Sequence, residues 1–430
     1  MIENASTYLT SSDVHTLKIN GGYRLCGETS TDISKNSTLQ LMAASILVRD
    51  GILTLSNVPD ITDVIVMKKI LEELGMKCTY TKDSLKMGGT LKSVTVSQDL
   101  ASSIRASIVL LGSLLTTYGE AILPLPGGDK LGSRPVDIHI DCLREFGIEF
   151  TQDNGVIHGK AKKLPLEGTD IFMRFPSVLA TGNLMMAATL AKGVTTIQNA
   201  ACEPEVVDLA IMLNSMGAKI KGAGTKVLTI HGVDSLHGIE YEPIPDRIET
   251  GTLLTAMVMT GGKGIIHNCI PDHNMALISL MKNCGVKLRY DNEGFIEIID
   301  STITEPIHAI AMPYPGLPTD LQPMVTCLAT RCPGTSTIVD TIYPERFHHV
   351  SELQKLGANI VHTGNQAVVN GITELAGAQI EGTDIRCVTS LVCAALAAKG
   401  ESTVKGIHHL YRGHGKLLDK INALGGKITL

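Results

Sequence analysis

One short pattern occurs six times along this 430-residue chain: an amphipathic helical run ends in an apolar residue and a glycine, and an alternating, strand-like run follows. The glycines stand 68 to 72 residues apart, at Gly75, Gly147, Gly217, Gly285, Gly357 and Gly425. A glycine just past a helix end readily takes the left-handed conformation that stops the helix. Spacing this regular indicates an internally repeated unit, and any fold of the chain has to accommodate six copies of it.

Each period also contains a second, more apolar helical run that ends at a glycine, for example "ATGNLMMAATLAKG" and "DIRCVTSLVCAALAAKG". A helix that is apolar on all sides is expected inside a core, and strands between helices produce α/β layers. Each unit is therefore predicted to run strand, buried helix, strand, amphipathic helix, strand. The period is longer than the roughly 20–50 residues of common solenoids, so we expect an α/β fold with two domains of three units each.

The boundary between the two domains is predicted near "IPDRIETGT", which opens the fourth unit. The N-terminal stretch "HTLKINGGYRLCGETS" precedes the first unit and reads as two additional strands. We expect these strands to complete the sheet of the C-terminal half. The first domain then covers residues 34–245, with a Gly-Pro loop at 124–137, and the second is discontinuous, covering 1–33 plus 246–430.

Composition excludes several classes of protein. The chain is 44% hydrophobic and 19% charged, which is typical of a globular protein. Its net charge of −6 provides no basic field for nucleic acid or anionic lipid. The ten cysteines contain no C-x-x-C pair and no zinc-ligand spacing, so we expect buried small side chains and no metal. Because no secretory signal or membrane-spanning run is evident, a cytoplasmic protein without a membrane partner is predicted, of undetermined oligomeric state.

Cations recur at the starts of the buried helices, where the helix dipole already places partial positive charge. An anion bound at the same place would make such cations favourable. Any single one is explained as a solvated surface group, but recurrence at equivalent positions predicts a shared cleft for phosphate and carboxylate ligands. The helix-start cations are Lys35, Arg105, Arg247 and Arg386, and three more, Arg134, Arg346 and Arg412, lie between the strand and the amphipathic helix of their units.

Acidic residues lie in the same layer as these cations. Asp129 stands at the tip of the loop "LPLPGGDKLGSRPVD", where a solvated turn is the simplest explanation. Asp320 begins the fifth buried helix, where N-capping explains an aspartate equally well. The others are Asp137, Asp246, Glu249 and Asp384.

Taken in order, the motifs resemble the enolpyruvyl transferases, and most closely the branch that uses UDP-N-acetylglucosamine in peptidoglycan synthesis. The resemblance runs from about residue 17 to 430. It implies an inside-out α/β barrel whose two domains, of three units each, close on a cleft. The motifs that carry it include "SKNSTLQLMAA", "SIRASIVLLG", "PLPGGDKLGSRPVDIHI", "CEPEVVDLA", "PDRIETGTLLTA", "PTDLQP", "ERFHHVSELQKLGA", "GTDIRCVTSLV" and "YRGHGKLLDKINALGGKI".

The resemblance also implies a reaction. The enolpyruvyl group of phosphoenolpyruvate, a co-substrate, is transferred to the 3-hydroxyl of UDP-N-acetylglucosamine through a tetrahedral ketal, phosphate is released, and no cofactor takes part. The implied catalytic residues are Asp129, Asp320, Lys35 and Arg412. Phosphoenolpyruvate is implied to bind Lys35, Asn36, Arg105, Arg134, Arg346, Arg386 and Arg412, and the nucleotide sugar to bind Arg134, Pro135, Val136, Asp137, Ile138, Ser177, Val178, Asp320 and Ile342.

Asp129 stands where most members of the family have cysteine. To hold a proton near neutral pH its pKa must rise by about 2–3 units, or about 3–4 kcal/mol. Desolvation on closure of the loop would supply part of that rise. We therefore interpret the loop as a lid that carries an acid into the cleft.

Some positions depart from the family pattern. Phe175 replaces a lysine, Leu179 a glycine, Cys202 an arginine and Tyr411 an aspartate. Two alternatives therefore remain open: a paralogue that acts on another acceptor, such as a UMP-like nucleotide or shikimate 3-phosphate, or a non-catalytic homologue that binds nucleotide sugars.

Overall fold

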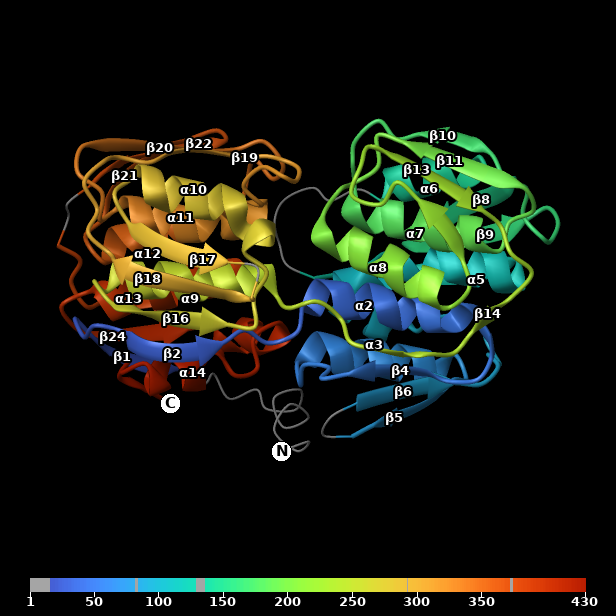
Figure 1. Cartoon of the computed structure of the whole chain (residues 1–430), viewed down its shortest axis with the longest axis horizontal. Coiled ribbons are helices and arrows are strands. Elements are labelled where there is room, and N and C mark those ends of the chain that lie inside the picture. The colour runs from blue at the N-terminus through green and yellow to red at the C-terminus, as the bar shows by residue number, and fades with distance from the viewer. Residues whose placement is uncertain (1–15, 82–83, 129–135, 292, 372–373) are drawn as a thin grey trace.

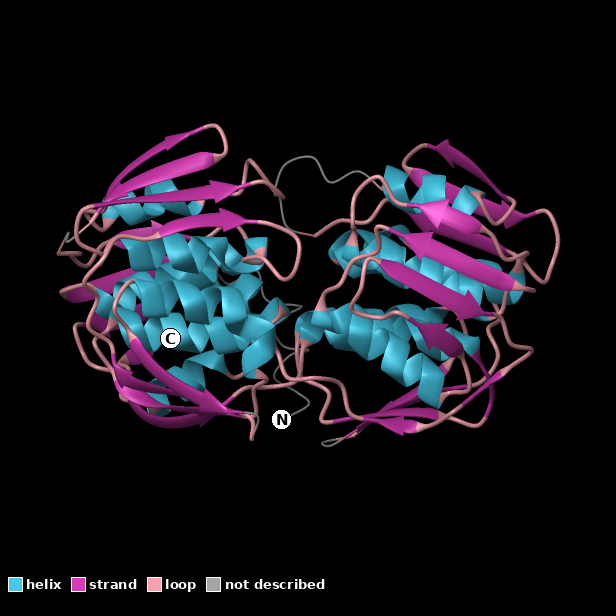
Figure 2. Ribbon diagram, turned by 45° about the horizontal axis from the view of Figure 1, so that its top comes forward, coloured by secondary structure: helices cyan, strands magenta, loops and turns pink. Residues whose placement is uncertain are grey.

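A computed structural model shows the protein as two lobes side by side (Figure 1). In each lobe helices lie inside and strands cover them (Figure 2). Each lobe has its own hydrophobic core, one built from residues between Leu39 and Leu236 and one that combines Leu17, Ile19 and Leu25 with residues after position 247. The structure describes residues 16–81, 84–128, 136–291, 293–371 and 374–430.

The first lobe packs an inner layer of almost fully buried helices against outer helices and sheets. Its inner helices are α2 (Lys35–Ala44), α5 (Leu110–Tyr118) and α7 (Val178–Thr189); the outer ones are α3 (Thr62–Glu73), α6 (Asp137–Arg144) and α8 (Pro204–Ser215); and the short ones are η1 (Ser45–Leu47), α4 (Gln98–Ser103) and η2 (Arg105–Val109). The strands are β3 (Val48–Asp50), β4 (Leu53–Ser56), β5 (Lys77–Tyr80), β6 (Ser84–Gly88), β7 (Glu120–Pro124), β8 (Ile148–Asp153), β9 (Val156–Ala161), β10 (Asp170–Phe172), β11 (Val194–Gln198), β12 (Lys219–Lys221), β13 (Val227–His231), β14 (Leu236–His237) and β15 (Glu240–Tyr241). They form sheets in the orders β15-β4-β6-β5, β7-β9-β8, β10-β11-β13-β12 and β14-β3.

The second lobe repeats this arrangement. Its inner helices are α9 (Arg247–Met259), α11 (Gln322–Ala329) and α13 (Ile385–Ala397); the outer ones are α10 (Met275–Asn283), α12 (His349–Lys355) and α14 (Leu417–Ala423); and the 3-10 turns are η3 (Pro271–Asn274), η4 (Thr319–Leu321) and η5 (Ile407–Arg412). The strands are β1 (Leu17–Gly21), β2 (Cys26–Ser30), β16 (Lys263–His267), β17 (Lys287–Asp291), β18 (Phe295–Asp300), β19 (His308–Ala311), β20 (Thr335–Asp340), β21 (Asn359–Thr363), β22 (Gln366–Asn370), β23 (Gln379–Glu381), β24 (Gly400–Lys405) and β25 (Ile428–Thr429). Their sheets have the orders β17-β18-β16-β2, β19-β20-β22-β21 and β23-β24-β1-β25.

The six glycines of the repeated pattern all follow a helix and have φ between 77° and 109°, which confirms the predicted turns. The predicted unit was wrong in one respect, because it contained a single strand after the outer helix. Usually two strands follow, as in the hairpin of β21 and β22, and β22 pairs with β20 in the interior of the sheet. A short turn at residues 364–365 separates these two strands.

The N-terminal strands belong to the C-terminal lobe, as their blue colour beside the red and yellow elements shows (Figure 1). They complete two sheets, however, where one was predicted. Strand β1 lies between β24 and β25 and is antiparallel to both, whereas β2 runs parallel to β16. The last strand of the first lobe, β15, pairs in parallel with β4 of the same lobe.

The chain thus passes between the lobes twice, at residues 31–34 and 242–246, and the two passages pair at Ile33 and Pro245.

In the described part of the chain no sheet closes on itself. None of the helices described combines the length and hydrophobicity needed to cross a bilayer. Most cysteines are buried, as predicted, but Cys26 is exposed and Cys78 is half-buried.

Candidate active site

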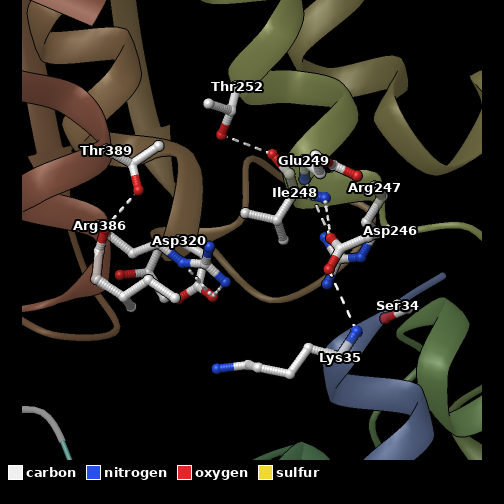
Figure 3. Close-up of polar contacts among 12 residues, drawn as sticks. Ser34, Lys35, Asp246, Arg247, Ile248, Glu249, Thr252, Asp320, Arg386 and Thr389 are labelled. Carbon is white, nitrogen blue, oxygen red and sulfur yellow. Dashed lines mark hydrogen bonds and ion pairs between the residues drawn. The ribbon is translucent and has the colours of Figure 1, made fainter. Parts of the chain in front are cut away.

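Local capping fixes where the inner helices begin. Ser34 accepts a hydrogen bond from Ser37 N and caps α2. Asp246 caps α9 with one carboxylate oxygen, and its other oxygen accepts Lys35 N at 3.3 Å, which ties the starts of α2 and α9 together (Figure 3). A cation follows each of these caps directly, so the caps place Lys35 and Arg247 at the junction between the lobes.

Asp320, in η4, lies between two arginines of the second lobe. Arg346 Nη1 donates to its Oδ1 at 2.7 Å, and Arg386 donates to its Oδ2 from Nη2 at 2.8 Å and from Nε at 3.0 Å. The capping explanation for Asp320 is wrong, because Pro318 occupies the cap position and the Asp320 side chain points to the arginines instead. The carboxylate is nevertheless 26% exposed, so it remains accessible to solvent.

The electrostatics of this node keep Asp320 ionised. Burial alone would raise its pKa, but the charges of Arg386 and Arg346, with a contribution from Lys35, outweigh burial and hold the pKa well below its usual range. The Lys35 side chain extends from α2 toward Asp320 and Arg386 (Figure 3). Asp320 is therefore a charged hydrogen-bond acceptor fixed in place by two planar guanidinium groups.

Both arginines are themselves positioned. Arg386 Nη1 also contacts His414 Nε2 at 2.9 Å. Burial, together with Arg386 and Lys35, lowers the pKa of His414 well below its ordinary value, so the imidazole is neutral and its Nε2 accepts from the guanidinium. Arg346 Nη1 donates to Thr319 Oγ1 at 3.1 Å, whereas its buried Nε has no hydrogen-bond partner among the described residues.

A second node joins the lobes through Asp63 in the first turn of α3. Lys35 Nζ lies 3.4 Å from Asp63 Oδ2, and Arg412 of the second lobe reaches Oδ1 with Nε at 3.0 Å and Oδ2 with Nη2 at 3.4 Å. The Asp63 carboxylate is only 4% exposed. Sequence reasoning missed Asp63, because an acid in a first helical turn is fully explained by the helix dipole.

Five of the residues assigned to the nucleotide sugar lie at the starts of two neighbouring helices. Val136 and Asp137 begin α6, and Ser177 caps α7 just before Val178. A buried hydrogen bond of 2.8 Å between His139 Nδ1 and Asn183 Nδ2 ties α6 to α7.

Burial, with a contribution from Arg105 at the start of η2, lowers the pKa of His139 to about 3, so the ring is neutral. Asn36 follows Lys35 in α2, and Ile342 N bonds Asp340 in the loop after β20. Ile138 N bonds Asp137 Oδ1 in the first turn of α6. The predicted Asp129, Arg134 and Pro135 lie outside the described residues.

Two predicted members of the charged layer have other partners. Arg247 forms a buried ion pair with Glu205. Glu249 pairs with Lys420 and accepts the backbone N–H of Asp32. Within the described ranges, no three His, Cys, Asp or Glu side chains come together as metal ligands.

Two nodes that each hold an acid between cations, one of them spanning both lobes, make a site suited to anionic ligands and proton transfer. The family model of EPSP synthase (3-phosphoshikimate 1-carboxyvinyltransferase) matches residues 19–421. The chain therefore belongs to this family of enolpyruvyl (1-carboxyvinyl) transferases. The fold agrees: the enolpyruvyl transferase NikO from Streptomyces tendae superimposes with a TM-score of 0.86 at 25% identity, covering 97% of this chain and 99% of that one.

Within the family, particular relatives are similar over nearly the whole chain. UDP-N-acetylglucosamine 1-carboxyvinyltransferase 1 of Caldanaerobacter subterraneus subsp. tengcongensis is 42% identical over 92% of this chain and 94% of its own length. UDP-N-acetylglucosamine 1-carboxyvinyltransferase of Prochlorococcus marinus is 43% identical over 96% and 90%. EPSP synthase from Acinetobacter baumannii, at 16% identity and a TM-score of 0.74, shares the fold.

Proposed function

We propose that the protein transfers the enolpyruvyl group of phosphoenolpyruvate to the 3-hydroxyl of UDP-N-acetylglucosamine and releases phosphate. In the addition step the sugar oxygen bonds C2 of phosphoenolpyruvate and C3 gains a proton, which gives a tetrahedral ketal. In the elimination step C3 loses a proton and the C2–O bond to phosphate breaks. The observation that carries the proposal is Asp320, held ionised between Arg346 and Arg386 in a chain 42–43% identical to relatives named for this reaction.

Asp320 is proposed as the base that accepts the proton of the sugar hydroxyl. With both arginines in place it is a weak base, because its pKa lies well below the usual range. A phosphate or carboxylate that draws Arg386 or Arg346 toward itself would weaken that influence and make Asp320 more basic. Binding of phosphoenolpyruvate would thereby prepare Asp320 for proton transfer, which links occupancy of the site to its chemistry.

Lys35 and Arg412 are proposed as the cations that bind phosphoenolpyruvate from opposite lobes, together with Asn36, Arg105, Arg134 and the two arginines beside Asp320. Asp63 forms ion pairs with both Lys35 and Arg412. An incoming trianion would share or replace that carboxylate, and would stabilise contact between the lobes by bridging the two cations. Asp129 is proposed as the acid on the loop at 124–137.

The remaining assignments follow from the same proposal. Val136, Asp137, Ile138, Ser177, Val178 and Ile342, with Arg134, Pro135 and Asp320, are the proposed contacts to the nucleotide sugar. We further propose that the two cores correspond to domains of residues 34–245 and 1–33 plus 246–430, arranged as inside-out α/β barrels. A cytoplasmic role in peptidoglycan synthesis without a cofactor completes the proposal.

Another acceptor is the second candidate. Leu179, where a glycine was expected, lies partly buried against the first core in the first turn of α7, next to the proposed nucleotide contacts. Tyr411, where an aspartate was expected, packs against the second core directly before Arg412. Both could reshape the acceptor site.

The test is release of phosphate from phosphoenolpyruvate with a panel of acceptors. UDP-N-acetylglucosamine as the preferred acceptor supports the main proposal, and UMP or shikimate 3-phosphate as the preferred acceptor supports the second. No turnover with any acceptor, together with binding of UDP-N-acetylglucosamine, would indicate a non-catalytic homologue.

A further inference from the structure

Two glutamates at the start of α8 form another connection between the lobes. Glu205, in the first turn of α8, forms a two-point ion pair with Arg247 of α9: Oε1 lies 2.9 Å from Nε and Oε2 lies 3.3 Å from Nη2. Both side chains are buried, with exposed fractions of 3% and 8%. The pair is therefore shielded from water, and loss of either partner would leave a buried charge uncompensated.

Glu203, the residue before α8, holds a different part of the second lobe. Its Oε1 accepts the backbone N–H of Tyr314 at 3.3 Å. Tyr314 belongs to residues 312–320, here called the Asp320 segment. The segment follows β19 and runs into η4, where it ends at Asp320. The segment is a compact turn, with Met312 N bonded to Leu317 O and Gly316 N bonded to Pro313 O, both at 3.0 Å. A short, hydrogen-bonded stretch of backbone therefore joins Tyr314 to Asp320.

The charge of Arg247 in this connection also interacts with the charge of Asp320. Burial opposes the charge of Arg247, but Glu205, Glu203 and Asp320 favour it and raise the pKa of Arg247. Glu205 therefore supplies the main compensating charge for Arg247, whose guanidinium also interacts with the charge of Asp320. Without it, the buried guanidinium would depend on Glu203 and Asp320 for compensation.

The other oxygen of Glu203, Oε2, is buried and has no hydrogen-bond partner among the residues that the structure describes. Burial raises the pKa of Glu203, while the Tyr314 N–H lowers it. Burying a carboxylate oxygen without a hydrogen bond is unfavourable. The packing of α8 alone does not explain why Glu203 is buried in this way, with its other oxygen bonded to Tyr314 of the second lobe.

We propose that Glu203 and Glu205 are positioning residues that dock the Asp320 segment and the start of α9 onto the first lobe and so determine where Asp320 stands when the acceptor binds. Neither residue touches the reacting atoms. Glu203 holds the backbone of the segment, and Glu205 holds Arg247 so that Arg346 and Arg386 remain the partners of Asp320. The kinetic part of this inference rests on the proposed function, whereas the structural part does not.

Glu203 is tested by comparing Glu203→Ala with Glu203→Gln, because the amide oxygen of glutamine still accepts the Tyr314 N–H. Amide hydrogen exchange in the absence of substrate should be about tenfold faster across residues 312–320 in the alanine variant, and unchanged in the inner helix α7. The glutamine variant should exchange nearly as the native protein does. Wild-type exchange in Glu203→Ala, or equal acceleration in both variants, would overturn the role of Glu203.

The same variants separate the inference from the proposed function. With phosphoenolpyruvate and UDP-N-acetylglucosamine, Glu203→Ala should lower kcat at least about tenfold with little change in the KM for phosphoenolpyruvate, and Glu203→Gln should restore most of the loss. If the native protein does not turn these substrates over, the proposed function fails, while the exchange experiment still decides the positioning role.

Glu205 is tested by Glu205→Gln alone and combined with Arg247→Met. The single change leaves Arg247 charged and buried, so kcat should fall about tenfold or more; removal of that cation in the double variant should recover activity. Glu297→Gln, which breaks the exposed pair of Glu297 with Arg289, is the matched control and should leave kcat unchanged. A double variant no more active than Glu205→Gln would overturn the role assigned to Glu205.

Discussion

Asp63 is the residue whose removal should have the clearest consequence. Its buried carboxylate compensates two cations, Lys35 and Arg412, and Asp63→Asn keeps the shape of the side chain while removing its charge. At an effective dielectric constant of about 20, each pair at about 4 Å is worth roughly 4 kcal/mol before desolvation is subtracted. Breaking a buried pair by removing one partner costs about 3–5 kcal/mol, so we expect the free energy of unfolding to fall by about 3 kcal/mol.

The same change should strengthen the binding of small anions. In Asp63→Asn, Lys35 and Arg412 lose the carboxylate that they share, and inorganic phosphate can take its place. Phosphate should then stabilise Asp63→Asn more than the native protein, by about 1.4 kcal/mol for each tenfold gain in affinity at concentrations above Kd. Urea denaturation with and without phosphate, at matched ionic strength, measures both effects.

Asp141→Asn is the control for this experiment. Asp141 also bridges two arginines, Arg144 at 3.2 Å and Arg174 at 2.9 Å, but its side chain is half exposed, so its loss should cost less than about 1 kcal/mol. The reasoning would be refuted if Asp63→Asn cost no more than Asp141→Asn, or if phosphate stabilised the two variants equally.

Three further predictions concern the proposed base, the proposed acid and a buried glutamate. Asp320→Asn should lower kcat by about 10²–10⁴-fold in the phosphate-release assay because the base is lost; unchanged turnover would remove Asp320 from that role. The epoxide fosfomycin, which alkylates the cysteine usual at position 129, should not inactivate this protein, because the Asp129 carboxylate is a poorer soft nucleophile; time-dependent inactivation with a mass adduct on Asp129 would contradict this. Burial raises the pKa of Glu249 from 4.5 to about 7, against the opposing charge of Lys420, so the folded state holds this proton more tightly than the unfolded chain. The stabilisation is complete below about pH 4.5 and is lost as pH rises through 7. Glu249→Gln should remove this pH dependence of the free energy of unfolding, worth up to about 3 kcal/mol, from urea unfolding curves. An identical pH profile in the variant would show that Glu249 does not titrate in this range.

Much of the fold could be read from local signals. The turn glycines, such as Gly217 and Gly285, report a backbone conformation that depends on a few neighbouring residues. The inner helices were recognisable because a run that is apolar on every side has no surface to offer to water. The second strand of each hairpin was missed, because a short turn between two alternating runs resembles a single long strand.

The candidate site was only partly predictable. The positions of Lys35 and Arg386 at helix starts pointed to an anion site, since a cation there is unfavourable without one. The same rule concealed Asp63, and the capping rule gave Asp320 the wrong partner. Each misassignment came from a local explanation that was sufficient by itself.

The six units, their inner and outer helices and the unusual cations could therefore be read along the chain, because they depend on hydrophobic pattern and backbone preference within a few residues. Which charges meet depends instead on the folded arrangement. Asp63 and Arg412 are 349 positions apart and Glu203 and Tyr314 are 111 apart, and they come together because the chain crosses twice between two separately packed cores. Coulomb attraction acts through space, so no pattern along the chain specifies its partners.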